Sequence, residues 1–399
     1  MRILLISLNG ARADHISCYD YVRATTPAID ALAAGATIFT DCHVSDLPAV
    51  AATEALFAAG AGQTAADEED KEEVHWVAQL RAHNWETIFC APDTPASGPG
   101  GSSWGFKETI YPAASPSSSL PTAEQIASRL VEHLQSLGQR DQWLLYVQFN
   151  EPALSTPIPA VFQEQFGEQA LPEYPDAELL QEDVRAAAGP DSAAALLPEP
   201  RSDAWAAYQA RMDAYDGALS YVDEQVGRIV ETLEKLQLLE ETVVIITSNH
   251  GMAIGDMGMY FAANNAAEAV TRVPLIMRWP GSSDSGWFYD GLLYQYDVGP
   301  TILEMLGIPL AVTPALSHAA AVRGDPLQAR KFLLLNINGP CRQRVIRTDR
   351  YRLIETLEAG PYAYAPRYLF DVRRDPQQSE NVAVEEEAVV AELLQQYGR

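Results

Sequence analysis

Two polar stretches follow apolar runs that have the composition of buried strands, and both carry side chains that could take part in metal chemistry. Residues 3–8 lead into Asn9-Gly10, and residues 242–247 lead into Ser248-Asn249-His250-Gly251. Because ligands of such sheets bind at the carboxyl ends of the strands, the two stretches should meet on the floor of a cleft. A hard divalent cation prefers charged oxygen ligands, and neither stretch contains a carboxylate. The two stretches therefore offer amide and imidazole groups to this cleft and no negative charge.

Further segments occur in a characteristic order along the chain. They include Arg272-Val273-Pro274-Leu275, Asp297-Val298-Gly299-Pro300-Thr301 and Leu369-Phe370-Asp371, and the complete set covers residues 12–19, 25–33, 220–227, 247–251, 272–281, 297–303 and 369–376. One such match is weak, but a collinear series over 399 residues is specific. On these segments the chain resembles the sulfatase family within the alkaline-phosphatase-like superfamily.

The pattern of apolar runs and helical periodicity predicts an α/β fold. The expected strands are 3–8, 86–90, 143–149, 242–247 and 272–279, and the expected helices are 27–34, 51–59, 122–137, 203–236 and 297–306. Residues 92–121 and 153–202 are rich in Pro, Ser, Ala and Gly, which favours surface excursions. The resemblance implies a large, mostly parallel, helix-flanked sheet over 1–322 and a small C-terminal antiparallel subdomain over 323–399. The second part has expected strands 332–336, 341–348 and 351–355 and a final helix 385–397.

The resemblance also implies where catalytic groups would lie. Members of the family use a modified cysteine, or Ser or Thr, at a helix N-terminus beside a divalent cation, with an arginine four residues later. Depending on the register chosen, Ala49 or Val50 occupies the position of the nucleophile, and Thr53 or Glu54 that of the arginine. None of these side chains can perform the implied role.

The implied metal and substrate ligands are replaced as well. The metal positions are Asn9, Gly10, Asn249 and His250, with no carboxylate among them, and we expect no bound metal and no other cofactor. His250 is interpreted as a structural histidine rather than a ligand. Ala153 stands where the family has a histidine that faces the substrate, and the lysine expected within 252–271 is absent.

Two functions remain open from the sequence. The first is a catalytically inactive sulfatase-like protein, a pseudoenzyme with a binding or regulatory role. The second is an active sulfuric or phosphoric ester hydrolase with relocated catalytic groups, which would need a divalent cation such as Ca²⁺ or Mg²⁺. Polar residues that could form a relocated site are His43, Ser45, Asp46 and Thr53, together with Asp14 and His15 after the first strand.

Charge and composition limit the partners. The net charge of −27 argues against nucleic acid and against anionic membranes, because the field of the protein repels both. The first strand begins directly after Met1 and the four cysteines show no paired motif, so the sequence as given predicts a cytoplasmic protein with reduced thiols. The ligand is left open, and the two partners considered are a second copy of the chain and an intact sulfatase.

Overall fold

The computed structural model describes residues 1–60, 75–94, 101–114, 119–153, 157–167, 169–172, 174–186, 191–192, 203–282, 286–309 and 313–398. Parts of both predicted excursions, 92–121 and 153–202, lie outside these residues. None of the helices in the described ranges is long and apolar enough to cross a membrane.

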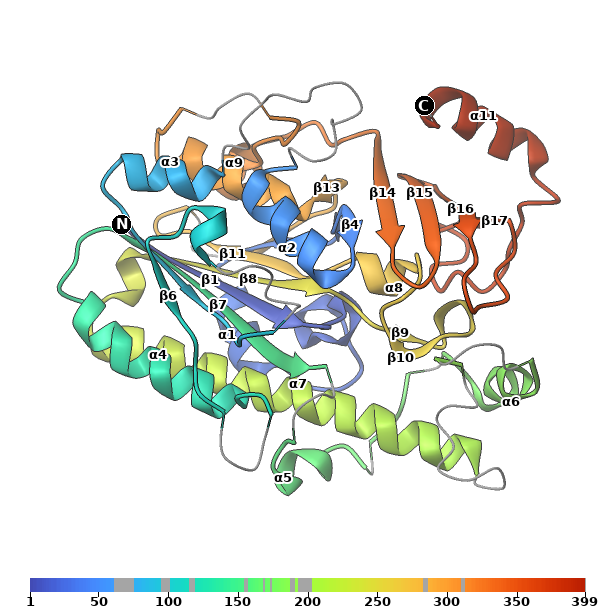
Figure 1. The fold of residues 1–399 in the computed structure, drawn as a ribbon, viewed down its shortest axis with the longest axis horizontal. Coiled ribbons are helices and arrows are strands. Elements are labelled where there is room, and N and C mark those ends of the chain that lie inside the picture. The colour runs from blue at the N-terminus through green and yellow to red at the C-terminus, as the bar shows by residue number, and fades with distance from the viewer. Residues whose placement is uncertain are drawn as a thin grey trace.

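A twisted sheet forms the centre of the molecule (Figure 1). It has eight strands in the order β12-β2-β11-β8-β1-β7-β5-β6. Its strands are β1 (Arg2–Asn9), β2 (Thr37–Phe39), β5 (Glu86–Cys90), β6 (Glu108–Ile110), β7 (Trp143–Pro152), β8 (Thr242–His250), β11 (Leu275–Arg278) and β12 (Trp287–Tyr289). Strand β1 runs parallel to both β7 and β8, whereas β11 is antiparallel to β8 and β2. The predicted mostly parallel sheet is confirmed.

Helices cover both faces of this sheet (Figure 1). One face packs against α1 (Pro27–Ala33), α4 (Ala123–Leu137) and α7 (Ala204–Lys235), and the other against α2 (Ala49–Ala58), α3 (Trp76–Ala82) and α9 (Val298–Met305). Side chains of β1 alternate between the two layers, since Leu4 and Ile6 join one apolar cluster and Ile3 and Leu5 the other. A strand buried on both faces must be apolar throughout, which explains the continuous runs in the sequence.

The C-terminal part forms a second sheet, as expected. It contains β14 (Phe332–Asn338), β15 (Arg342–Thr348), β16 (Tyr351–Glu358) and β17 (Arg367–Asp371), which are antiparallel to one another in that order. Helix α11 (Glu387–Tyr397) packs on this sheet. The short strand β4 (Asp46–Leu47) extends this sheet by pairing in parallel with β14. The two parts are therefore joined by main-chain hydrogen bonds, and the boundary at 322/323 stays a prediction.

Both expected surface excursions contain regular structure within the described residues. The segment 92–121, expected to be a surface excursion, contains β6, which is the edge strand of the central sheet. The segment 153–202 contains the helices α5 (Ala160–Gln163) and α6 (Ala177–Ala186). The remaining short elements are β3 (Cys42–His43), β9 (Ala253–Ile254), β10 (Tyr260–Ala262), α8 (Glu268–Thr271), β13 (Leu293–Tyr294) and α10 (Ala319–Arg323).

Candidate functional site

The ends of three adjacent strands bring the predicted metal positions together. Asn9, the last residue of β1, pairs with Pro152 of β7 on one side and with His250 of β8 on the other. A Cβ atom built on Gly10 would lie 3.4 Å from the Cβ of Ala153 and 3.6 Å from Cε1 of His250. The strand ends thus place three of the sequence-derived positions in direct contact.

Carbon atoms occupy the space in front of Gly10. The methyl group of Met252 lies 3.2 Å from the position that a Cβ on Gly10 would take, and the side chain of Met252 is buried. Gly10 itself has a φ of +82°, a conformation that residues with side chains rarely adopt. Any side chain at this position would meet strain as well as close contacts, so the glycine is suited to the packing around it.

Two asparagine side chains at the ends of β1 and β8 have polar atoms without partners. Asn249 is only 2% exposed, and neither Oδ1 nor Nδ2 of its side chain has a hydrogen-bond partner in the structure. Oδ1 of Asn9 is buried and equally unpartnered. The ends of β1 and β8 therefore carry polar groups that the surrounding protein atoms do not satisfy.

His250 is fixed in one neutral form. Its Nδ1 lies 2.6 Å from the carbonyl oxygen of Gly251 and therefore donates a hydrogen to it, which leaves Nε2 as an acceptor. Burial lowers the pKa of His250, although the bond to Gly251 opposes this shift. The imidazole is neutral at neutral pH and adds no charge to the strand ends.

These residues do not fit the hard divalent cation that the family resemblance implies. The available donors are two amide groups and one neutral imidazole, whereas Mg²⁺ and Ca²⁺ are held chiefly by charged carboxylates. The fourth implied metal position, Gly10, has no side chain. Carbon atoms of Met252 and Ala153 lie within 3.4 Å of the place that a Cβ atom on Gly10 would occupy. The donor set and the packing both disagree with such an ion.

The position of the implied nucleophile lies at the start of α2. Ala49 is the first residue of this helix, Val50 is the second, and both are half-buried. The hydroxyl of Thr53 donates to the carbonyl oxygen of Ala49 at 2.9 Å, a bond within the helix, and Glu54 is exposed. The hydroxyl of Thr53 is therefore engaged in its own helix.

The groups considered for a relocated site have other partners. The Ser45 hydroxyl donates to the carboxylate of Asp46 at 2.7 Å, and Nε2 of His43 lies 2.7 Å from the carboxylate of Asp41. Among the described residues, no hydrogen bond joins Ser45 or Thr53 to a histidine. After β1, Asp14 pairs with Arg12 and His15 pairs with the buried Asp216, each at 2.8 Å.

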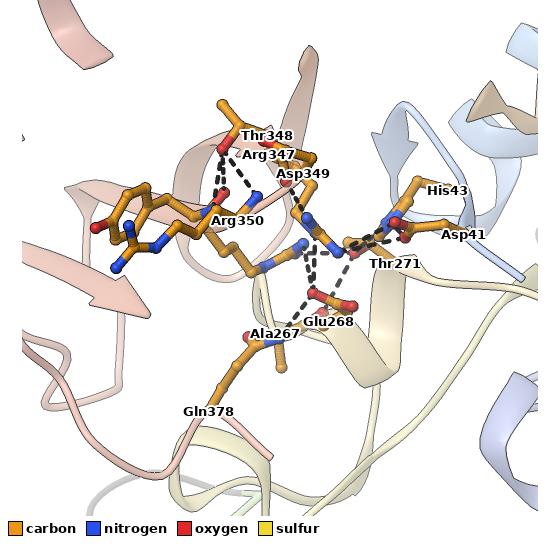
Figure 2. Close-up of polar contacts among 12 residues, drawn as sticks. Asp41, His43, Ala267, Glu268, Thr271, Arg347, Thr348, Asp349, Arg350 and Gln378 are labelled. Atoms are coloured by element: carbon orange, nitrogen blue, oxygen red, sulfur yellow. Dashed lines mark hydrogen bonds and ion pairs between the residues drawn. The ribbon is translucent and has the colours of Figure 1, made fainter. Parts of the chain in front are cut away.

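A buried ion-pair network that the sequence did not reveal lies near these groups (Figure 2). Asp41, next to β3, pairs with Arg347 of β15 at 3.2 Å, and Glu268 of α8 pairs with the same guanidinium at 3.2 Å. Glu268 also faces Arg352 of β16 at 3.8 Å, and Arg352 is fully buried. The network links both sheets through α8. Local sequence does not mark these residues, since β15 carries three arginines and only Arg347 among them joins the network.

Asp41, His43 and Glu268 also offer ligand atoms within 4.8 Å of one another, a spacing that a metal ion could use. The guanidinium groups of Arg347 and Arg352 already supply positive charge to these carboxylates. An additional cation would meet strong repulsion there. We therefore interpret the cluster as a structural ion-pair network.

This network makes the stability of the fold sensitive to acid. Burial acts to raise the pKa of Asp41 and Glu268, but hydrogen bonding to His43 and the charges of Arg347 and Arg352 outweigh it and hold both pKa values below their ordinary range. A carboxyl group with a depressed pKa stabilises the fold above its unfolded value of about 4 and loses this contribution as the pH falls. We expect the melting temperature to fall steeply between about pH 5 and pH 3.

The comparison that checks this prediction uses Arg347→Gln, which should make the decline with pH shallower because it removes the charge that lowers both pKa values. Arg323→Gln is the control, since Arg323 forms a largely exposed pair with Glu304 at 3.4 Å. The measurement is the melting temperature of the parent protein, Arg347→Gln and Arg323→Gln at several pH values from pH 7 to pH 3. Parallel curves for the parent protein and Arg347→Gln would contradict the assignment.

A family model described as sulfatase matches residues 2–308 of the chain. Choline-sulfatase from Rhizobium meliloti (strain 1021) is 27% identical over 179 residues, a match that covers 43% of this chain and 32% of that protein. N-acetylgalactosamine-6-O-sulfatase from Bacteroides thetaiotaomicron is 28% identical over 201 residues, which covers 43% of this chain and 39% of that protein. The matched part spans well under half of the length of these curated relatives.

Solved structures resemble the chain over almost its whole length. A 2-O GAG sulfatase superposes with a TM-score of 0.75 and 18% identity, covering 99% of this chain and 92% of that one. A phosphonate monoester hydrolase of Agrobacterium radiobacter superposes with a TM-score of 0.73 and 18% identity, covering 98% and 93%. At this level of identity the likeness establishes the fold, and function depends on the residues at the site.

Proposed function

The chain belongs to the sulfatase family, and we propose that it is a member without ester hydrolase activity, a pseudoenzyme that acts by binding. The observation that carries the proposal is the chemistry at the ends of β1, β7 and β8. Asn9, Gly10 and Asn249 supply no negative charge, and the side chains of Ala153 and Met252 bring carbon atoms close to Gly10. Neither a dication nor a charged transition state is stabilised by such surroundings.

The absence of a nucleophile supports the same proposal. Ala49 and Val50, at the start of α2, have only aliphatic side chains, and Thr53 bonds to the helix backbone. Nucleophile, metal and cationic groups act as one unit in hydrolases, so that loss of one of them already removes most of the rate. The alternative, an active hydrolase with relocated groups, has less support because Ser45 and His43 bind to different neighbours.

A binding or regulatory role fits a chain that keeps the frame of the fold. The main sheet, its flanking helices and the C-terminal sheet are all present. A second copy of the chain or an intact sulfatase is the partner we propose, because the packed frame offers the surface on which such a contact can form. Size-exclusion chromatography with light scattering measures self-association when the protein is run alone. The same measurement on a mixture with an intact family member detects a complex between the two.

Divalent cations are expected to leave the melting temperature unchanged to within about 1 °C, because an ion that does not bind the folded state cannot stabilise it. The measurement is thermal unfolding of protein purified without chelator, then titrated with Mg²⁺, Ca²⁺ or Zn²⁺. An intact sulfatase treated in the same way is the positive control. A saturable rise of several degrees with one ion, abolished in Asn249→Ala, would contradict the proposal.

A further inference from the structure

A cavity of about 460 Å³ lies between the segment that follows β1, helix α8 and the segment that follows β17. None of Asn9, Gly10, Asn249 and His250 lines it, so it is distinct from the strand-end cluster. Its volume falls within the range of small-molecule sites. Three guanidinium groups and five carboxylates contribute to its wall, and their pairing determines what the cavity can hold.

Two of the three guanidinium groups are neutralised by carboxylates of the same wall. Arg12 pairs with Asp14 and with Asp256, each at 2.8 Å, and Arg12 also donates to the carbonyl oxygen of Met252. Arg347 pairs with Asp41 and Glu268. Each of these guanidinium groups therefore already has two anionic partners and has little charge to offer a ligand.

The third guanidinium, that of Arg272, differs from the other two. Its backbone N–H donates to the carbonyl oxygen of Glu268 at 2.7 Å, which ties the residue to α8, and the residue is half-buried. Within the described ranges, its side chain forms no hydrogen bond and no ion pair. Burial acts to raise the pKa of Asp14 and Asp41, but hydrogen bonds and neighbouring charges, that of Arg272 among them, hold both below their ordinary range. The Arg272 guanidinium therefore lies near two carboxylates of this wall without forming an ion pair with either.

One carboxylate of the wall is equally unpaired. Asp290, which follows β12, is exposed and lines the cavity. In the part of the chain that the structure describes, its side chain forms no ion pair and accepts no hydrogen bond. The wall of the cavity thus has one guanidinium without an ionic partner, that of Arg272, and one such carboxylate, that of Asp290. The wall as a whole carries more carboxylates than guanidinium groups.

We propose that this cavity binds a small zwitterion, whose oxyanion group is held by Arg272 and whose ammonium group faces Asp290. A guanidinium binds a carboxylate or sulfonate through two parallel hydrogen bonds, which makes Arg272 the anchor. A ligand with only negative charge is repelled by the excess of carboxylates, and one with only positive charge leaves the half-buried Arg272 without a partner. The inference goes beyond the proposed function, since it holds whether or not the chain hydrolyses esters.

The probes are ω-amino acids from β-alanine to 6-aminohexanoate, a series that varies the separation of the two charges. Isothermal titration calorimetry at low ionic strength should give saturable binding with one site for at least one length. Hexanoate and 1-aminohexane, which each keep one charge, should bind at least about tenfold more weakly than the best zwitterion. Taurine, compared with β-alanine, shows whether sulfonate or carboxylate is preferred.

Two variants and one control separate the contributions. Arg272→Gln should weaken binding of the best probe by about tenfold or more. Asp290→Asn should weaken binding of the zwitterion, whereas hexanoate should bind at least as well as it does to the parent protein, because one repelling carboxylate is gone. Arg323→Gln, which changes a largely exposed arginine outside the cavity lining, should bind like the parent protein.

No saturable binding of any probe up to about 20 mM would overturn the proposal. Equal binding of hexanoate and the zwitterions would also overturn it, as would unchanged affinity in Arg272→Gln. If Arg272→Gln does not fold, Asp290→Asn still tests the proposal, because Asp290 is exposed and its replacement should not disturb folding. In that variant the ratio of zwitterion affinity to hexanoate affinity should fall, and an unchanged ratio would overturn the proposal. If the protein proves to hydrolyse esters, the pseudoenzyme proposal fails, but the binding of zwitterions to this cavity is tested separately and can still hold.

Discussion

Glu268→Gln is expected to destabilise the fold by about 3 kcal/mol, because it leaves two buried guanidinium groups with less compensating charge. Arg347 is 5% exposed and Arg352 is 0% exposed, so water cannot replace the lost partner. The amide can keep a hydrogen bond to Gln378, which donates to Glu268 at 2.7 Å in the parent protein, so the change tests charge rather than shape. Urea unfolding at neutral pH measures the difference.

The matched control for this change is Glu304→Gln, which alters an ion pair whose two side chains are 52% and 45% exposed. Surface pairs contribute little, and the control should unfold within about 0.5 kcal/mol of the parent protein. Replacing Glu268 and Arg352 together by apolar residues should recover part of the loss, because it removes both buried charges. Equal stability of Glu268→Gln and Glu304→Gln would show that the network does not hold the two sheets together.

Asn249→Asp is expected to cost about 2 to 3 kcal/mol at pH 8 and much less at pH 4. Asn249 is 2% exposed and its amide atoms have no hydrogen-bond partner, so a carboxylate there would lose water without a partner to compensate it. Burial then raises the pKa of the new carboxyl group above its unfolded value of about 4, and the folded state loses stability as the pH rises above that value.

Unfolding of Asn249→Asp by urea at pH 4 and pH 8 checks this result, with the exposed Asn338→Asp as the control for the same chemical change. Added Mg²⁺ or Ca²⁺ should not restore the loss, since a single carboxylate among neutral donors is a weak site for a hard dication. Recovery of stability on adding one of these ions would show that the strand ends still form a metal site. An unchanged stability at pH 8 would show that the position is better hydrated than its burial indicates.

Much of the fold could be predicted from the sequence because its long elements are strongly periodic or uniformly apolar. The strands at 3–8 and 242–247 and the helix at 203–236 were expected within a few residues of β1, β8 and α7. The short strands β2, β6 and β12 were missed, since three residues give no periodic signal. They are ordered by pairing with the main sheet, which local sequence does not encode.

The spatial placement of three of the named residues could be predicted for the same reason, whereas their role stays a prediction. The ends of the strands placed Gly10, His250 and Ala153 together, as expected from a parallel sheet. The close approach of Met252 to Gly10 and the unpaired state of Arg272 could not be predicted, because both depend on contacts between segments far apart in the chain. Whether an arginine forms an ion pair depends on which residues the fold brings next to it, and the sequence around Arg272 does not indicate this.

The most direct test of the central claim is turnover of an aryl sulfate, a phosphate monoester and a phosphonate monoester by the purified full chain, supplied with Mg²⁺ or Ca²⁺. We predict rates equal to the buffer control, because Ala49 or Val50 supplies no nucleophile and the strand ends supply no charged metal ligand. A substrate-dependent rate above the control that is abolished by Ser45→Ala, Thr53→Ala or His250→Ala would contradict the account and establish a relocated active site.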